Sequence, residues 1–173
     1  MRRRADAQRI ETFANELGRS ARSDVKMYLT GGATAVLVGW RDTTVDIDVR
    51  LEPESDELLR AIPALKERLE VNVELASPVD FIPELPGWRD RSPFVLRAGR
   101  LDVHHFDLYS QALAKIERGF ALDLADVRAM VERGLVEPAR GLELFSRIEP
   151  DLYRFPAIDP RSLRARVDGA LRG

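Results

Sequence analysis

Two glycines followed by two aspartates one residue apart constrain this chain more than any other feature. Gly31 and Gly32 end a short apolar run, and after residues 33–45 the chain continues as Asp46-Ile47-Asp48-Val49. Apolar and charged residues alternate through this stretch, which is the period-two pattern of a strand. Residues two apart on a strand share a face, so the two carboxylates point the same way, about 7 Å apart.

The carboxylate pair predicts a metal site beside a phosphate-binding turn. Like charges held this close repel each other unless a cation lies between them. Mg²⁺ prefers oxygen ligands and is commonly held by one or two carboxylates together with substrate phosphates. Glycine backbone can approach a phosphate closely, and a helix that follows offers free N–H groups. We therefore expect Asp46 and Asp48 to bind Mg²⁺ or Mn²⁺, with Gly31 and Gly32 beside the phosphates.

A third carboxylate would complete such a cluster and could activate an attacking hydroxyl. Residues 71–76 alternate again: we expect Val71, Val73 and Leu75 on the buried face of that strand and Asn72 and Glu74 on its polar face. Glu74 is therefore the first candidate. Asp102, in a later predicted strand, is the alternative.

Composition narrows the class of protein. The chain has 173 residues, 45% of them hydrophobic, which is enough for one core or one core with a small appendage. A net charge of −2 gives no global reason to expect nucleic acid or a membrane as partner. The absence of cysteine excludes disulfides, thiolate catalysis and cysteine-bound zinc. No apolar run follows the basic start of the sequence, so we expect a cytoplasmic protein without a membrane span.

Periodicity divides the chain into a mixed half and a helical half. We expect an α/β core over residues 1–107 and a helical region over residues 108–173 that packs on it. Strands are predicted at 26–30, 43–51, 71–76, 94–97 and 100–106, and helices at 4–22, 32–38, 56–69, 109–118, 122–133, 138–148 and 162–171. The proline-rich segment between residues 78 and 93 is predicted to be a loop.

These motifs resemble the DNA polymerase β-type nucleotidyltransferase superfamily. The resemblance is carried by the Gly31-Gly32-Ala33 turn, the Gly39-Trp40-Arg41-Asp42-Thr43 segment and the Asp46-Ile47-Asp48 strand. The abortive-infection toxin branch and related uncharacterised bacterial families share this progression. They also share a lysine on the first helix of the helical half, here Lys115, followed by an Asp-x-x-Asp, here Asp123 to Asp126.

The resemblance implies an α/β (α+β) fold, a nucleotidyltransferase-like mixed sheet flanked by helices with a C-terminal helical bundle. It implies transfer of a nucleotide from an NTP, with Mg²⁺ or Mn²⁺, to a hydroxyl of an RNA, a protein or a small molecule. By position, Asp46, Asp48 and Glu74 would bind metal and catalyse, while Gly31, Gly32, Arg41 and Lys115 would contact the nucleotide. It also implies a toxin–antitoxin or phage-defence setting with a cognate partner protein.

Two departures from the superfamily pattern keep a second interpretation open. Gly32 stands where a serine is common, and Glu74 stands where an aspartate is usual. The alternative is a catalytically degenerate binding module or an antitoxin-like partner. Structural roles also compete for single residues: Lys115 could form an ion pair, Asp123 and Asp126 could cap a helix, and His104 and His105, on opposite faces of one strand, could be hydrogen-bonded strand residues.

Overall fold

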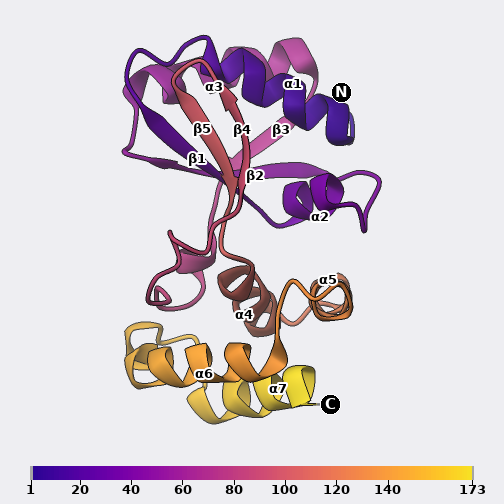
Figure 1. Ribbon diagram of the computed structural model, residues 1–173, viewed down its shortest axis with the longest axis vertical. Coiled ribbons are helices and arrows are strands. Elements are labelled where there is room, and N and C mark those ends of the chain that lie inside the picture. The colour runs from indigo at the N-terminus through magenta and orange to yellow at the C-terminus, as the bar shows by residue number, and fades with distance from the viewer. Residues whose placement is uncertain (1, 173) are drawn as a thin grey trace. The chain divides into compact units, whose positions relative to one another are not determined.

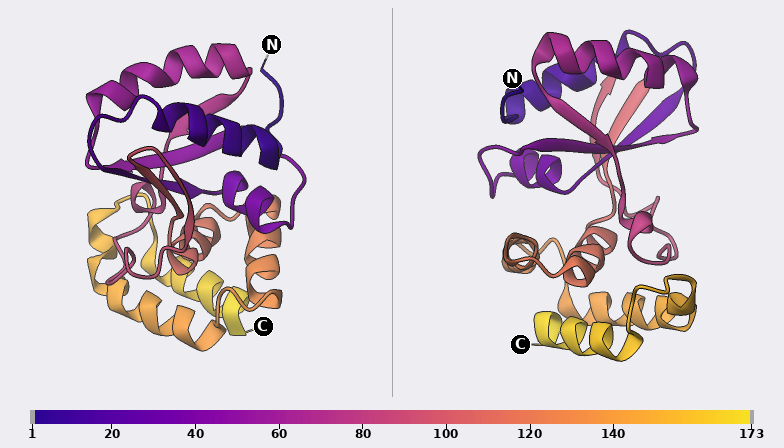
Figure 2. Two further views of the ribbon diagram at one scale, coloured as in Figure 1. Left: turned by 45° about the horizontal axis from the view of Figure 1, so that its top comes forward. Right: turned by 180° about the vertical axis from the view of Figure 1, so that it is seen from behind.

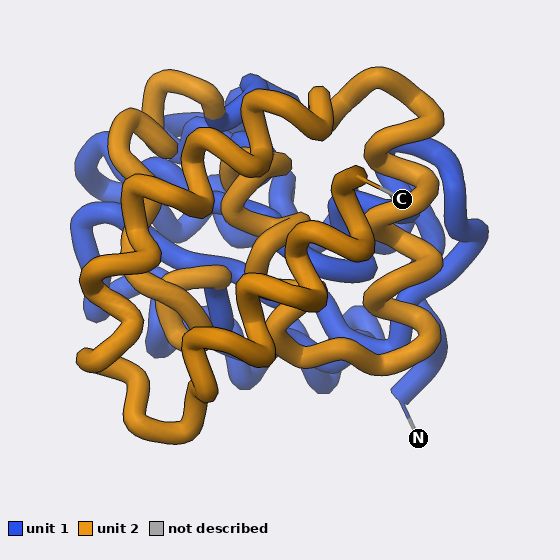
Figure 3. Tube along the Cα trace, turned by 90° about the horizontal axis from the view of Figure 1, so that it is seen from below, with its two compact units in different colours: residues 1–77, 92–105 blue, residues 78–91, 106–173 orange. Residues whose placement is uncertain are grey.

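The computed structural model describes residues 2–172, which fall into two compact units (Figure 3). Unit 1 comprises residues 1–77 and 92–105, and unit 2 comprises residues 78–91 and 106–173. The proline-rich segment therefore belongs with the helical half, although it lies between two strands of unit 1 in the sequence.

Unit 1 is built on one mixed five-stranded sheet (Figure 1). Its strands are β1 (Val25–Thr30), β2 (Asp46–Glu52), β3 (Asn72–Leu75), β4 (Phe94–Ala98) and β5 (Leu101–His105), in the order β3-β2-β1-β5-β4. The β1–β2 and β4–β5 pairs are antiparallel, whereas the β1–β5 and β2–β3 pairs are parallel. β3 is therefore an edge strand next to the aspartate strand.

Three helices complete unit 1: α1 (Ala7–Gly18), α2 (Gly32–Val38) and α3 (Asp56–Leu69). α1 and α3 lie side by side (Figure 1) and bury the apolar face of the sheet, which includes Ile47, Val49 and Val103. Side-chain caps fix the starts of these two helices, because Asp6 accepts from the N–H of Arg9 and Ser55 from that of Leu58. The polar residues of the strands are thereby directed to the opposite face.

One prediction for β3 is wrong. The alternation of residues 71–76 placed three apolar side chains on the buried face, and Val71 and Val73 are indeed buried. Leu75, by contrast, is 61% exposed. It lines an open cavity between β3 and α3 at the edge of the sheet, where no further strand covers it.

Unit 2 is helical and is organised around α4 (Leu108–Arg118). α5 (Ala121–Glu132), α6 (Pro138–Ile148) and α7 (Pro160–Arg172) all pack on α4, and α6 runs beside α7 (Figure 2). Two short 3₁₀ helices also pack on this bundle. η1 (Pro78–Asp80) packs on α4, and η2 (Glu149–Arg154) packs on α6 and α7. Trp88 from the proline-rich segment stacks on Phe106, with 4.1 Å between ring centroids, and is buried.

The predicted fold class, a mixed sheet flanked by helices with a helical region after it, is confirmed. The first and last residues of most predicted helices and strands lie within two or three residues of those in the structure. Nowhere in residues 2–172 does a helix have both the length and the apolar character needed to cross a lipid bilayer.

Candidate functional site

Asp46 and Asp48 lie on the polar face of β2, as the alternation predicts. Their neighbours Ile47 and Val49 are fully buried on the other face, whereas both aspartates are partly exposed. Because the core holds the apolar residues, the strand cannot slip by one position without burying both carboxylates. The hydrophobic core therefore sets the direction of this acidic pair.

The neighbouring strand brings Glu74 beside this pair. In the parallel register of β2 and β3, Asp46 lies opposite Asn72 and Asp48 lies opposite Glu74. The Asn72 side-chain amide donates to Asp46 Oδ1 at 2.5 Å and to Glu74 Oε1 at 2.7 Å. Arg2 Nη1 in turn donates to Asn72 Oδ1 at 2.6 Å. Asn72 thus links the carboxylates of two strands into one network.

The alternative third carboxylate lies elsewhere on the sheet. Asp102 is opposite Lys26 at the start of β1, whereas Asp48 is opposite Thr30 at the end of β1. Four residues of strand correspond to about 13 Å along the sheet, and Asp102 is also two strands away from β2. Its carboxylate is bound by Arg97 at 2.9 Å. Of these two carboxylates, Glu74 is therefore the one that lies beside Asp46 and Asp48.

The first glycine of the turn lies against Asp48. Gly31 has φ 63° and ψ −131°, a conformation that is essentially restricted to glycine. A Cβ atom at this position would lie 3.0 Å from Asp48 Oδ2. The turn and the aspartate strand, which are separated in sequence, are therefore adjacent in unit 1.

The second glycine is required by packing. A Cβ atom on Gly32 would lie 2.0 Å from Thr44 Oγ1 and 3.3 Å from Arg41 Nη1. Thr44 cannot move away easily, because it pairs with the backbone of Ala5 and its hydroxyl donates to the carbonyl of Asp46 at 3.0 Å. A serine at position 32 could not be housed without displacing Thr44. The same geometry places the Arg41 guanidinium beside the glycine turn.

Lys115, the other residue predicted to contact the nucleotide, belongs to unit 2 and forms a buried ion pair there. It is 6% exposed, and its Nζ lies 2.8 Å from Asp126 Oδ2 and 3.6 Å from Asp123 Oδ1. Both aspartates are also buried. These three residues tie α4 to α5, which is the ion-pair role that the sequence left open for Lys115.

The donor chemistry at β2 and β3 suits a hard divalent cation, since Asp46, Asp48 and Glu74 offer only carboxylate oxygens. Within residues 2–172, no group of three or more acidic or histidine side chains is already arranged to enclose a metal ion. A Mg²⁺ site of the kind predicted needs only one or two carboxylates, because substrate phosphates supply other ligands. The residues present therefore fit a cation that binds together with a nucleotide.

A cavity of about 510 Å³ opens beside Glu74 in unit 1. It lies between β3 and α3, with apolar walls that include Ile62, Val73 and Leu75, and with Arg2 among its lining residues. A second molecule could thus reach the exposed carboxylate of Glu74 from the edge of the sheet.

A buried pair behind the glycine turn holds α2 on the sheet. Thr34 Oγ1 lies 3.0 Å from His105 Nδ1 and 3.3 Å from the carbonyl oxygen of Leu29. The hydroxyl can donate to Leu29 while it accepts from the protonated Nδ1 of a neutral ring. Burial, with a smaller contribution from His104, lowers the pKa of His105 to about 4. His104 Nδ1 lies 3.0 Å from the Ser92 carbonyl oxygen, so both histidines are hydrogen-bonded strand residues.

We expect His105 to make the stability of the protein depend on pH below neutrality. Its pKa is about 4 when folded and about 6.5 when unfolded, so above pH 6.5 both states are neutral and His105 has no effect. As the pH falls from 6.5 to 4, the unfolded state binds a proton first, and the free energy of unfolding drops. The expected loss between pH 7.5 and pH 5 is about 2 kcal/mol.

Urea denaturation of the wild type and of His105→Gln at these two pH values measures this effect. Other groups titrate alike in both proteins, so the difference between the two pH dependences belongs to His105. An identical loss of stability in both proteins would contradict the assignment.

Sequence reasoning missed the linking residues Asn72 and Thr44. The alternation of 71–76 placed Asn72 on the same face as Glu74, which was a usable signal, but the strand register that sets it opposite Asp46 is not readable from one sequence. Nothing in the local pattern marked Thr44, whose role depends on the close approach of Gly32.

Comparison with known protein families gave a match over most of the chain. The family model described as "Nucleotidyltransferase of unknown function (DUF6036)" matches residues 7–137, so the chain belongs to that family. The comparisons with curated proteins and with solved structures found no match.

Proposed function

We propose that this member of the nucleotidyltransferase family transfers a nucleotide from an NTP to a hydroxyl group of an RNA, a protein or a small molecule. The observation that carries the proposal is the convergence of three features. Asp46 and Asp48 share a polar face, Glu74 lies opposite Asp48, and the glycine-only turn at Gly31 lies against the Asp48 carboxylate.

In this proposal each residue has a defined task. Asp46 and Asp48 hold Mg²⁺ or Mn²⁺ together with the nucleotide, and the cation supplies charge neutralisation for the phosphates. The backbone at Gly31 and Gly32 allows the triphosphate to approach closely, and Arg41, beside Gly32, adds positive charge.

Glu74 accepts the proton of the attacking hydroxyl, whose oxygen then bonds to the α-phosphorus as the bond to pyrophosphate breaks. The Asn72 amide positions Asp46 and Glu74 relative to each other. The rate enhancement in such a site comes mainly from positioning and from charge stabilisation.

Substitution of Glu74 tests the catalytic part of this proposal. We expect Glu74→Gln to lower transfer of label from α-³²P-NTP, in a cell lysate with Mg²⁺, by about a hundredfold, since a general base typically contributes 10²–10⁴. The affinity for the NTP should change by less than about threefold, because Asp46 and Asp48 remain. Equal transfer by both proteins would contradict the role of Glu74.

The second candidate function is a non-catalytic nucleotide-binding or partner-binding module, as in a toxin–antitoxin or defence pair. The observation that favours it is the Asn72 amide, which donates to two of the three proposed metal ligands. This candidate predicts saturable binding of an NTP or of a cognate protein without transfer of label by the wild type. Label on an acceptor, with pyrophosphate released, would exclude it.

A further inference from the structure

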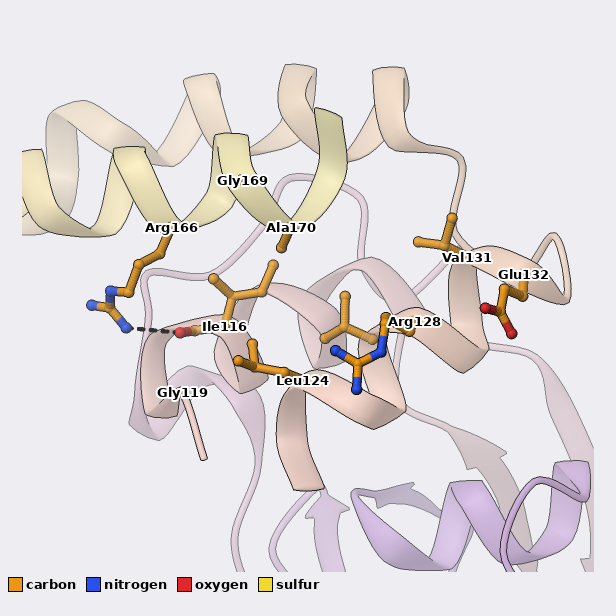
Figure 4. A pocket seen from close by; sticks show the side chains of 10 residues that line it. Ile116, Gly119, Leu124, Arg128, Val131, Glu132, Arg166, Gly169 and Ala170 are labelled. Atoms are coloured by element: carbon orange, nitrogen blue, oxygen red, sulfur yellow. Dashed lines mark hydrogen bonds between the residues drawn. The ribbon is translucent and has the colours of Figure 1, made fainter. Parts of the chain in front are cut away.

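Unit 2 contains a cavity that the proposed chemistry does not use. It has a volume of about 480 Å³ and lies where α5 and α7 both pack on α4 (Figure 4). Pockets that bind small organic molecules commonly measure about 300–1,000 Å³. The volume of this cavity lies in that range, and its mouth is open to solvent, since most of the residues that line it are partly or fully exposed.

The interior of this cavity is apolar. Ile116 of α4 and Val127 of α5 form a fully buried floor, and Leu124, Val131 and Ala170 form partly exposed walls. On α5, Leu124, Val127 and Val131 line the cavity, and Met130 is buried.

Gly169 lies at the mouth of the cavity, on α7. It lies inside α7 and lines the cavity, and a Cβ atom there would meet nothing within 4 Å. Glycine within a helix is unfavourable relative to alanine, so it normally has a packing reason. Gly141 in α6 has one, because its Cβ would lie 2.9 Å from Leu171 Cδ1. Gly169 is exposed, and a Cβ there has no such neighbour within residues 2–172, so this position leaves the mouth of the cavity open.

The charged residues at the cavity supply one available cation. Arg166 is already used, because it donates to the carbonyl oxygens of Ile116 and Glu117 at 2.8 and 2.7 Å. Arg128 makes no hydrogen bond or ion pair with any residue of the described chain, 2–172, although Glu132 lies one helical turn away. In Figure 4 the Arg128 side chain lies between the labelled Leu124 and Val131 of α5.

We propose that this cavity binds a small amphipathic anion, an apolar body of medium-chain length that carries one carboxylate. The apolar body occupies the space above Gly169 between α5 and α7, and the carboxylate pairs with Arg128. A charge-assisted pair of this kind fixes the orientation of a ligand that is otherwise held by burial of apolar surface.

The test uses 1-anilinonaphthalene-8-sulfonate as fluorescent probe, displaced by decanoate or by decanol. Decanoate should displace the probe from the wild type about tenfold more strongly than decanol, because only decanoate pairs with Arg128. Arg128→Gln should remove that preference and leave displacement by decanol within twofold of the wild type.

Gly169→Leu adds a bulky apolar side chain at the cavity, at a position where a Cβ atom meets nothing within 4 Å. It should abolish probe and decanoate binding and raise the melting temperature by about 2 °C, because a glycine leaves a helix interior. Ala165→Leu, on an exposed part of α7 outside the cavity, is the matched control and should bind decanoate as the wild type does. Decanoate binding that persists in Gly169→Leu, or a wild type without saturable binding, would overturn the proposal.

Discussion

Lys115→Met is expected to lower the free energy of unfolding by about 3–5 kcal/mol, the typical cost of removing one partner from a buried ion pair. Asp126 and Asp123, whose side chains are only 2% and 7% exposed, would then lose the Lys115 ammonium, and Asp123 would keep Arg118 at 3.6 Å from its Oδ2. Neither carboxylate could reach water to recover its solvation. The large effect therefore comes from the two acids left behind rather than from the lysine itself.

Urea denaturation measures this loss, and two variants isolate its cause. Adding Asp123→Asn and Asp126→Asn to Lys115→Met should restore most of the stability, because the uncompensated charges are gone. Lys26→Met, at an exposed lysine of β1, should change stability by less than about 0.5 kcal/mol.

The same variant separates the two roles that the sequence left open for Lys115. If Lys115 contacted phosphate, Lys115→Met would weaken NTP binding and leave the stability unchanged. The ion pair with Asp126 at 2.8 Å predicts the opposite pattern: lower stability, with NTP affinity preserved under conditions where the protein remains folded.

Asp46→Asn combined with Asp48→Asn is expected to abolish Mg²⁺-dependent NTP binding. The two substitutions keep the size of the side chains but remove both negative charges that would hold the cation. The strand itself should persist, because Ile47, Val49 and Leu51 continue to fix β2 on the core. A loss of binding without a loss of folding would therefore report on the site alone.

Asp102→Asn is the matched control for this experiment. Asp102 is a carboxylate of the same sheet, but it lies two strands from β2 and pairs with Arg97. Its substitution should leave NTP binding unchanged. A loss of binding in this variant would instead support Asp102 as the third carboxylate.

The fold could be predicted to a large extent because its elements carry strong periodic patterns. β2 shows a strict alternation that the core enforces, and α4 ends at Gly119, which adopts the left-handed conformation expected of a helix C-terminus. The edge of the sheet was less predictable. Leu75 continues the alternation of β3, yet no further strand of the described chain lies beside it, because local periodicity carries no information about which neighbour is absent.

The candidate site was predictable in its residue types but not in its connections. Asp46 and Asp48 could be placed on one face from sequence alone, since strand geometry determines it. The choice between Glu74 and Asp102 needed the strand order, which depends on long-range pairing. Two positions defined by close approach, Thr44 against Gly32 and Lys115 against Asp126, likewise required the tertiary structure.

Calorimetric titration of the four NTPs with Mg²⁺ into the wild type, the Asp46→Asn/Asp48→Asn double variant and Asp102→Asn tests the central claim most directly. The account predicts saturable, Mg²⁺-dependent binding of at least one NTP to the wild type and to Asp102→Asn, and none to the folded double variant. Binding of equal strength by the double variant, or no binding by the wild type, would contradict a nucleotide site at Asp46 and Asp48.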